Sequence, residues 1–426
     1  MPAPDLYNLA PLAPMLLAGL ALALAPVAWV AWRHRQGTPL GRIHALTLVA
    51  LFLTFDLVLF GAFTRLTDSG LGCPDWPGCY GSASPIGAAS AIEAAQTGLP
   101  SGPVTERKAW IEMIHRYFAT GVGALILLLA VFSWRAKPSA APSGMGTGIG
   151  ALRNSQDDER AGLYAQRWWA TATLVWVCIQ GAFGALTVTM KLFPAIVTLH
   201  LLGGLILLAL LTVQVVRLSA VAAPRLTTFS LALPSAQAPA LSVGLIRLLW
   251  IAFTALAVQV ALGGWVSTNY AVLACSDFPR CQGSFWPAMD FAQGFELWRP
   301  LGRTAGAGGA GAGEQIPFAA LTAIHFTHRA FAMVAAALLG LLAWQLNRHV
   351  ALRAHSRWLA GLLSLQVATG LANVVLNWPL LAAVLHTGGA AALVVVLTWV
   401  ACVAFVKQGE LPQGASVGGK GWGVAA

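Results

Sequence analysis

Nine apolar segments, each long enough to cross a lipid bilayer as a helix, constrain what this chain can fold into more than any other feature. A hydrocarbon core of about 30 Å requires roughly 20 residues of helix. Segments of this kind lie at 11–32, 43–64, 109–134, 168–190, 195–216, 244–267, 318–345, 356–376 and 380–403. They are continuously apolar instead of alternating, which favours helices over a β-barrel. The sequence predicts an all-α polytopic membrane protein with eight or nine spans, since only a short connection separates the last two.

The basic residues indicate how these spans are oriented. The chain of 426 residues carries a formal net charge of +10, although only 9% of its residues are charged and 58% are hydrophobic. Lysine and arginine gather in the connections after the first, third and seventh spans, at Arg33, Arg35, Arg42, Arg135, Lys137, Arg153, Arg160, Arg167, Arg348, Arg353 and Arg357. The positive-inside rule predicts that these connections are cytoplasmic, with a periplasmic N-terminus and a cytoplasmic C-terminus. Because the charge follows topology, we expect no nucleic acid partner.

The first apolar segment is interpreted as a retained helix. It lacks the basic region that begins a secretory signal peptide, and a basic stretch follows it. No Arg-rich amphipathic transit sequence precedes it, which favours a bacterial inner (plasma) membrane over an organelle. The sequence thus predicts a multi-pass protein of the bacterial inner membrane.

The chain contains an internal repeat, which determines the expected architecture. Residues 61–81 align without gaps on 263–283, at an offset of 202, and both stretches contain Cys-x-Asp-aromatic-Pro-x-Cys. Two further correspondences follow: Gln180, Gly184, Val188 and His200 match Gln366, Gly370, Val374 and His386 at an offset of 186, and His115-Arg116 matches His328-Arg329. The order of elements is therefore the same in both halves.

The repeat predicts two pseudo-symmetric four-helix bundles in one chain. The first bundle covers 41–218 and the second covers 243–407. Residues 1–40 add an extra N-terminal transmembrane helix and a basic cytoplasmic loop. Residues 219–242 are expected to form a cytoplasmic linker, and residues 408–426 a cytoplasmic tail.

Four histidines are candidate haem ligands. His115, His200, His328 and His386 each lie in an apolar segment near its predicted periplasmic end, at places related by the repeat. Ionisable side chains in membrane spans are costly and usually functional, although a helix-to-helix hydrogen bond is the structural alternative for each. Two imidazoles on opposing helices, without cysteine or carboxylate clusters at metal spacing, suit the axial positions of a haem iron better than tetrahedral zinc. We predict two haems per chain.

Charged residues next to these histidines differ between the halves. Arg116 and Arg329 could meet haem propionates through charge-assisted hydrogen bonds, or could simply snorkel to the interface. Glu112 lies three residues before His115, on the same helix face, whereas its counterpart is His325. This asymmetry predicts chemistry in the first half and a permanent cofactor in the second. A carboxylate favoured by the helix dipole is the alternative reading of Glu112.

The cysteines of the two repeated loops are predicted to form disulfides. Cys73 and Cys79, like Cys275 and Cys281, are six residues apart in loops assigned to the oxidising side of the membrane. Metal binding and free thiols are the alternatives, and a redox-active role for the first pair stays open. Each closed loop is expected to brace or cover a haem site.

Three further residues within the spans are interpreted as structural. Cys178 and Cys402 lie at positions that the repeat does not match, and they are predicted to be buried packing residues. Asp56 lies in the middle of the second span, where an ionised carboxylate is expensive, so it is expected to be protonated or partnered. A structural hydrogen bond is preferred to a proton path for Asp56.

With these residues in place, the chain resembles the haem A synthase family over about 41–407. The likeness rests on GAFTRLTDSGLGCPDWPGCYG, Glu112-Met-Ile-His115-Arg116, His200, His328-Arg329 and His386. The family oxidises the C8 methyl group of haem O to the formyl group of haem A for terminal oxidases. The resemblance implies that His115 and His200 hold the substrate haem and that His328 and His386 hold a haem b. It also implies that Glu112 is catalytically important.

The resemblance and the composition suggest partners as well. The lipid bilayer is the source of a farnesyl-bearing substrate, which haem O synthase, a farnesyltransferase, would supply. Terminal oxidase assembly factors would receive the product, and an electron acceptor is required. The chemical identity of this acceptor stays open. The sequence is also compatible with a homo-oligomer.

Two other functions were weighed against this one. A bis-histidine membrane cytochrome b would carry electrons, but its haems normally stack at two depths, and here all four histidines share one depth. A quinone-linked thiol oxidase would use the two cysteine pairs and would leave the histidines unexplained.

Overall fold

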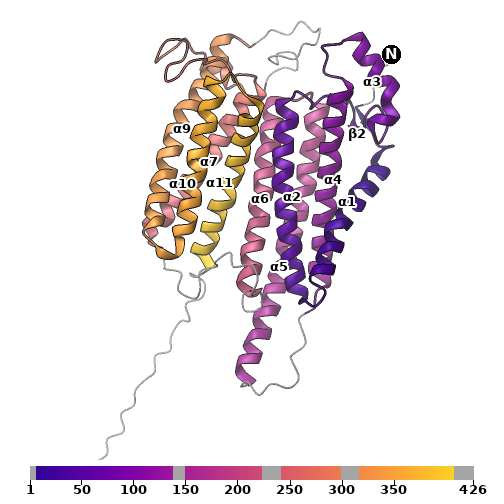
Figure 1. Ribbon diagram of the computed structural model, residues 1–426, viewed down its shortest axis with the longest axis vertical. Coiled ribbons are helices and arrows are strands. Elements are labelled where there is room, and N and C mark those ends of the chain that lie inside the picture. The colour runs from indigo at the N-terminus through magenta and orange to yellow at the C-terminus, as the bar shows by residue number, and fades with distance from the viewer. Residues whose placement is uncertain (1–5, 138–148, 223–240, 299–315, 407–426) are drawn as a thin grey trace, which may run out of the picture.

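The computed structural model describes residues 6–137, 149–222, 241–298 and 316–406 (Figure 1). Within these ranges nine helices are long and apolar enough to cross a membrane. They are α1 (Leu12–Arg33), α2 (Pro39–Leu66), α4 (Glu106–Arg135), α5 (Ile149–Thr189), α6 (Pro194–Ala222), α7 (Val243–Thr268), α9 (Phe318–Asn347), α10 (Arg353–Val375) and α11 (Leu380–Val406). All nine predicted spans are confirmed, and a turn separates α10 from α11.

Short elements connect these helices. They are the strands β1 (Tyr7–Asn8) and β2 (Trp76–Pro77), the helices α3 (Ala89–Gly98) and α8 (Phe291–Gly294), and the 3-10 turns η1 (Pro85–Ala88) and η3 (Val350–Leu352). The tail predicted at 408–426 and most of the linker predicted at 219–242 lie outside the described residues.

Side-chain caps define where several of the long helices begin. The hydroxyl of Thr38 accepts a hydrogen bond from Gly41 N at the start of α2, where Pro39 occupies the first helical position. Thr105 caps α4 and Ser242 caps α7 in the same way. Such caps satisfy N–H groups that have no partner within the helix, so these starting points are encoded locally.

The eight long helices that follow α1 in the described residues form two rings of four. In the first half α2 packs on α4 and α6, and α5 closes the ring between α4 and α6. In the second half α7 packs on α9 and α11, and α10 closes the ring. The halves meet mainly through α6 and α11, and α2 and α7 each also contact the other half (Figure 1). The repeat in the sequence therefore corresponds to a repeat in the packing.

The apolar cores occupy the end of each bundle that is distant from the cysteine loops. In the second half the core includes Leu249, Leu342, Leu359 and Leu397, which are at most 1% exposed. The first half has an equivalent core around Leu125, Leu129 and Leu211. The opposite end of each bundle, here called the loop end, carries the histidines and the cysteine loops.

Candidate functional site

Each half carries a closed cysteine loop at the loop end. Disulfide bonds join Cys73 to Cys79 and Cys275 to Cys281, as the sequence predicts. An aspartate organises each loop, which the sequence analysis did not anticipate. Asp75 accepts hydrogen bonds from Tyr80 N and Gly81 N, at 2.6 and 2.8 Å. Asp277 accepts them from Gln282 N and Gly283 N, at 2.6 and 2.9 Å.

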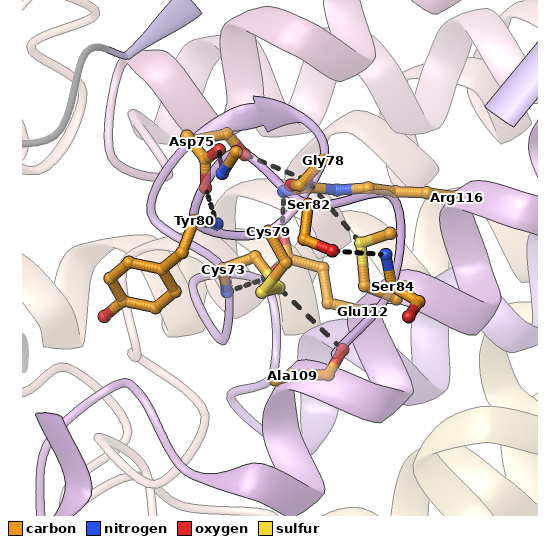
Figure 2. The surroundings of a disulfide bond; sticks show 12 residues. Cys73, Asp75, Gly78, Cys79, Tyr80, Ser82, Ser84, Ala109, Glu112 and Arg116 are labelled. Atoms are coloured by element: carbon orange, nitrogen blue, oxygen red, sulfur yellow. Dashed lines mark hydrogen bonds and ion pairs between the residues drawn. A yellow bond between two sulfur atoms is a disulfide. The ribbon is translucent and has the colours of Figure 1, made fainter. Parts of the chain in front are cut away.

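Glu112 joins helix α4 to the first loop (Figure 2). Its Oε2 accepts a hydrogen bond from Cys73 N at 2.7 Å, and its Oε1 lies 2.5 Å from Nη2 of Arg116. The side chain is buried, with 3% of the residue exposed. A buried carboxylate held by an ion pair and a hydrogen bond is fixed in position, because loss of the first would leave an unpaired buried charge and loss of the second an unpaired buried N–H group.

Arg116 completes this arrangement by binding the loop backbone. Its Nη1 donates to the carbonyl oxygens of Asp75 (2.9 Å) and Pro77 (3.2 Å) and to that of Gly78 (Figure 2). The guanidinium therefore links Glu112 to the loop. Its contact with a haem propionate stays a prediction.

The second half repeats this geometry without the carboxylate. Nδ1 of His325 accepts a hydrogen bond from Cys275 N at 3.2 Å, in the place of Glu112. Arg329 donates to the carbonyls of Asp277 (2.9 Å), Pro279 (3.3 Å) and Arg280 (3.0 Å). The two halves thus share one scaffold, and the ion pair between Glu112 and Arg116 has no equivalent among the described residues of the second half.

All four candidate haem ligands lie against glycines of neighbouring helices. A Cβ added to Gly61 would approach Nε2 of His115 to 3.1 Å, and one added to Gly263 would approach Cε1 of His328 to 3.0 Å. The same relation links Gly184 with His200 (3.4 Å) and Gly370 with His386 (3.2 Å). Glycine leaves room beside each imidazole that any larger residue would fill.

The histidines of each half converge. His115 on α4 and His200 on α6 belong to the same ring of four helices, as do His328 on α9 and His386 on α11. Within the described ranges, no three histidine, cysteine, aspartate or glutamate side chains gather as ligands of a metal ion. Two imidazoles on different helices of one ring, each beside a glycine of an adjoining helix, suit a flat porphyrin, whose own nitrogens supply the remaining ligands of the iron.

The rings differ in how they are held. Nε2 of Gln180 lies 3.1 Å from Nδ1 of His200, and Nε2 of Gln259 lies 3.1 Å from Nδ1 of His328. The hydroxyl of Thr369 lies 2.9 Å from Nδ1 of His386. Such contacts orient ligand histidines.

His115 is the exception among the four. Among the described contacts its ring makes no hydrogen bond and stacks on Phe60, with centroids 6.2 Å apart. The repeat places Leu57 where the second half has Gln259. The contacts of Gln259 and Thr369 were missed by sequence reasoning, because neither residue has a polar counterpart in the first half.

Two expectations about residues within the spans are corrected. Cys178 is exposed on α5 and Cys402 is partly exposed, so the prediction that both are buried is wrong. Asp56 is partly exposed on α2 and makes no hydrogen bond or ion pair with the residues that the structure describes, contrary to the preferred interpretation. Helical phase explains both errors, because hydropathy alone does not reveal which face of an apolar helix points towards lipid.

Comparisons with known proteins identify the family of the chain. Residues 44–398 match the model of the COX15-CtaA family, described as cytochrome oxidase assembly proteins. The chain is 37% identical to the Heme A synthase of Shewanella oneidensis, over 82% of this chain and 92% of that protein. It is 28% identical to that of Erythrobacter litoralis, over 82% and 93%, and 26% identical to that of Rhizorhabdus wittichii, over 86% and 95%.

Proposed function

The chain belongs to the COX15-CtaA family of cytochrome oxidase assembly proteins and acts in haem A synthesis, and from this premise we propose that it oxidises the C8 methyl group of haem O to the formyl group of haem A. The observation that carries the proposal is the difference between the halves at one position. Glu112 is a buried carboxylate paired with Arg116, whereas its counterpart His325 has no charged partner within hydrogen-bonding distance among the residues that the structure describes. A single carboxylate beside one of two similar sites supports chemistry in the first half alone.

The proposal assigns different haems to the two halves. His115 and His200 bind haem O and its product haem A, and His328 and His386 bind a resident haem b. The hydrogen bonds to both rings of the second pair suit a permanently held group. The unbonded ring of His115 suits a site that must release its product.

Glu112 contributes charge and position to the proposed reaction. In the proposed reaction water supplies the formyl oxygen, protons are released, and positive charge develops at the carbon as electrons leave. A carboxylate one turn from His115 can accept a proton or stabilise that charge. Its contacts with Cys73 N and Arg116 hold it still, so little reorganisation accompanies the reaction. Haem b, when bound, would supply one-electron redox chemistry, and an external acceptor completes the electron balance.

The membrane setting follows from the same proposal. We place the loop end in the periplasm of a bacterial inner membrane, since the basic connections lie at the opposite end and disulfides form in oxidising compartments. A farnesyl-bearing haem O would enter from the bilayer after release by haem O synthase. Terminal oxidase assembly factors would then receive haem A.

Matched histidine variants test this assignment. The chain is co-expressed with a source of haem O, and the haems extracted from purified protein are identified by chromatography and mass spectrometry. Wild type should yield haem A and haem b. His386→Ala should lose haem b, and its counterpart His200→Ala should lose haem O and haem A while keeping haem b.

Other results would overturn the proposal. Haem b alone in wild type, despite available haem O, would favour a bis-histidine electron carrier. Loss of the same haem in both variants would contradict the division of labour between the halves.

A further inference from the structure

Residues 6–33, which comprise β1 and α1, have no counterpart among the described residues of the second half and lie outside the stretch that matches the family model. We call this segment the N-terminal clamp because of its contacts. It lies beside α4 and beneath the first cysteine loop, as the arrangement of α1, β2 and α4 in Figure 1 shows. Its position beside the first loop indicates a role at the site of the first half.

The clamp pairs with the first loop through the backbone. β1 lies parallel to β2, with Tyr7 opposite Trp76 and Asn8 opposite Pro77. Trp76 N donates to the carbonyl oxygen of Leu6 at 3.1 Å. Tyr7 also donates its hydroxyl proton to Thr189 Oγ1 at 3.1 Å, which ties the strand to the end of α5.

Side chains of the clamp pack closely on the same loop. A Cβ added to Gly78 would come within 2.5 Å of Cγ of Pro11, and one added to Gly81 would come within 2.8 Å of Nδ2 of Asn8. Met15 is buried in one cluster with the disulfide of Cys73 and Cys79. The loop therefore lies between the clamp and the helix that carries Glu112.

Helix α1 is itself fixed to α4. Gly19 of α1 lies directly against Thr120, and Gly121 of α4 lies against Leu22, with 3.3 Å between an added Cβ and Cβ of Leu22. Glycines on both helices permit this close approach. Thr120 is one turn beyond Arg116, so the clamp holds the helix as well as the loop.

The second loop provides an internal comparison, since it has the same disulfide and the same backbone turn without a clamp. Gly81 and Gly283 have φ angles of 74° and 72°, yet a Cβ on Gly283 would meet nothing within 4 Å. Asp75 is 1% exposed, whereas Asp277 is partly exposed and Phe278 is 61% exposed. The clamp covers the first loop, and among the described residues no such segment covers the second.

We propose that the N-terminal clamp is a positioning element, which holds the first cysteine loop on Glu112 and Arg116 and so fixes the carboxylate of the substrate half. Cys73 N and three loop carbonyls are the partners of Glu112 and Arg116. A loop free to lift away would release both side chains together. The expected effect of the clamp on turnover rests on the proposed function of Glu112. Its expected effect on the loop rests on the contacts alone.

The loop is tested by the reduction of its disulfide in the purified full-length protein. A phosphine reductant is followed by maleimide labelling, and the rates for Cys73–Cys79 and Cys275–Cys281 are measured by mass spectrometry of peptides. In wild type, Cys73–Cys79 should be reduced several-fold more slowly. Asn8→Gly combined with Pro11→Gly should accelerate its reduction and leave that of Cys275–Cys281 unchanged. Equal acceleration at both disulfides, or none at either, would overturn the clamp.

Substitutions in the two glycines provide a second, milder test. Gly81→Ala and Gly283→Ala impose the same backbone strain, but only Gly81→Ala crowds Asn8. Gly81→Ala should accelerate the reduction of Cys73–Cys79 more than Gly283→Ala accelerates the reduction of Cys275–Cys281. Adding Asn8→Gly to Gly81→Ala should remove this difference. Equal effects of the two alanines would count against the clamp even if the double glycine variant does not fold.

The haem content separates positioning from folding. A loosened clamp should leave haem b and bound haem O in place while the ratio of haem A to haem O falls, because the substrate site survives and the carboxylate does not stay in position. An unchanged ratio would contradict the positioning role. If Glu112→Gln itself forms haem A normally, the proposed function fails, while the reduction rates still decide whether the clamp holds the loop.

Discussion

Glu112 and His325 occupy the same position in the two halves, and each accepts a hydrogen bond from the backbone N–H of the first cysteine of its loop. In both halves an arginine follows four residues later and binds carbonyl oxygens of the loop. One position thus carries a carboxylate in one half and an imidazole in the other. Under the proposed function, divergence at this one position of a repeated scaffold would let one half hold the substrate and the other half hold a cofactor.

The glycines beside the histidines should be required for haem binding. Gly370→Ala brings a Cβ to 3.2 Å from His386, and overpacking of this kind costs on the order of 1–3 kcal/mol. We expect weaker retention of haem b, measured by its absorbance after a detergent wash. Gly361→Ala on the same helix has no atom within 4 Å of the added Cβ and should retain haem b fully. Equal loss in both variants would contradict the role of Gly370.

The side chain of Gln259 should stabilise the second haem site. Gln259→Leu removes the contact with the ring of His328 and introduces the residue found at the equivalent position 57. Loss of a group that orients a ligand histidine typically costs about 10–100-fold in affinity. Titration of the haem-depleted protein with haem b measures this effect, and Leu57→Ala is the control. Unaltered affinity in Gln259→Leu would show that the ring needs no such support.

The second cysteine loop should loosen in acid. The backbone N–H of Gly283, followed by that of Gln282, lowers the pKa of Asp277 below its usual value. A carboxylate with a lowered pKa stabilises the loop above its unfolded-state pKa, and that contribution is lost as the pH falls through the folded-state pKa. Reduction of Cys275–Cys281 should therefore accelerate in acid relative to Asp277→Asn, in which the group does not titrate. Parallel pH profiles for the two proteins would rule this mechanism out.

Much of the architecture was predictable, because membrane spans and an internal repeat both leave strong patterns in the sequence. The nine spans follow from hydropathy, and the equivalence of the halves follows from the match of 61–81 with 263–283. The disulfides followed from the same repeated loop and are present. These features depend on segment length, composition and spacing, which a single sequence displays directly.

Other features depend on the path of the backbone, and most of them leave no pattern in the sequence. The ion pair of Glu112 and Arg116 has the helical i, i+4 spacing and could have been found from it. The binding of Arg116 to three loop carbonyls could not have been predicted, because the sequence does not show where backbone carbonyls lie. A two-residue strand such as β1 is likewise too short for periodicity, and the apolar sequence of α5 does not reveal that Cys178 lies on an exposed face.

The haem content of Glu112→Gln tests the central claim most directly. Glutamine keeps an oxygen that can accept from Cys73 N and loses the charge that pairs with Arg116. The matched variant His325→Gln changes the equivalent position of the other half. With haem O supplied, Glu112→Gln should contain haem O and haem b without haem A, and His325→Gln should still form haem A. Normal haem A in Glu112→Gln, or its loss in both variants alike, would contradict a catalytic carboxylate confined to the first half.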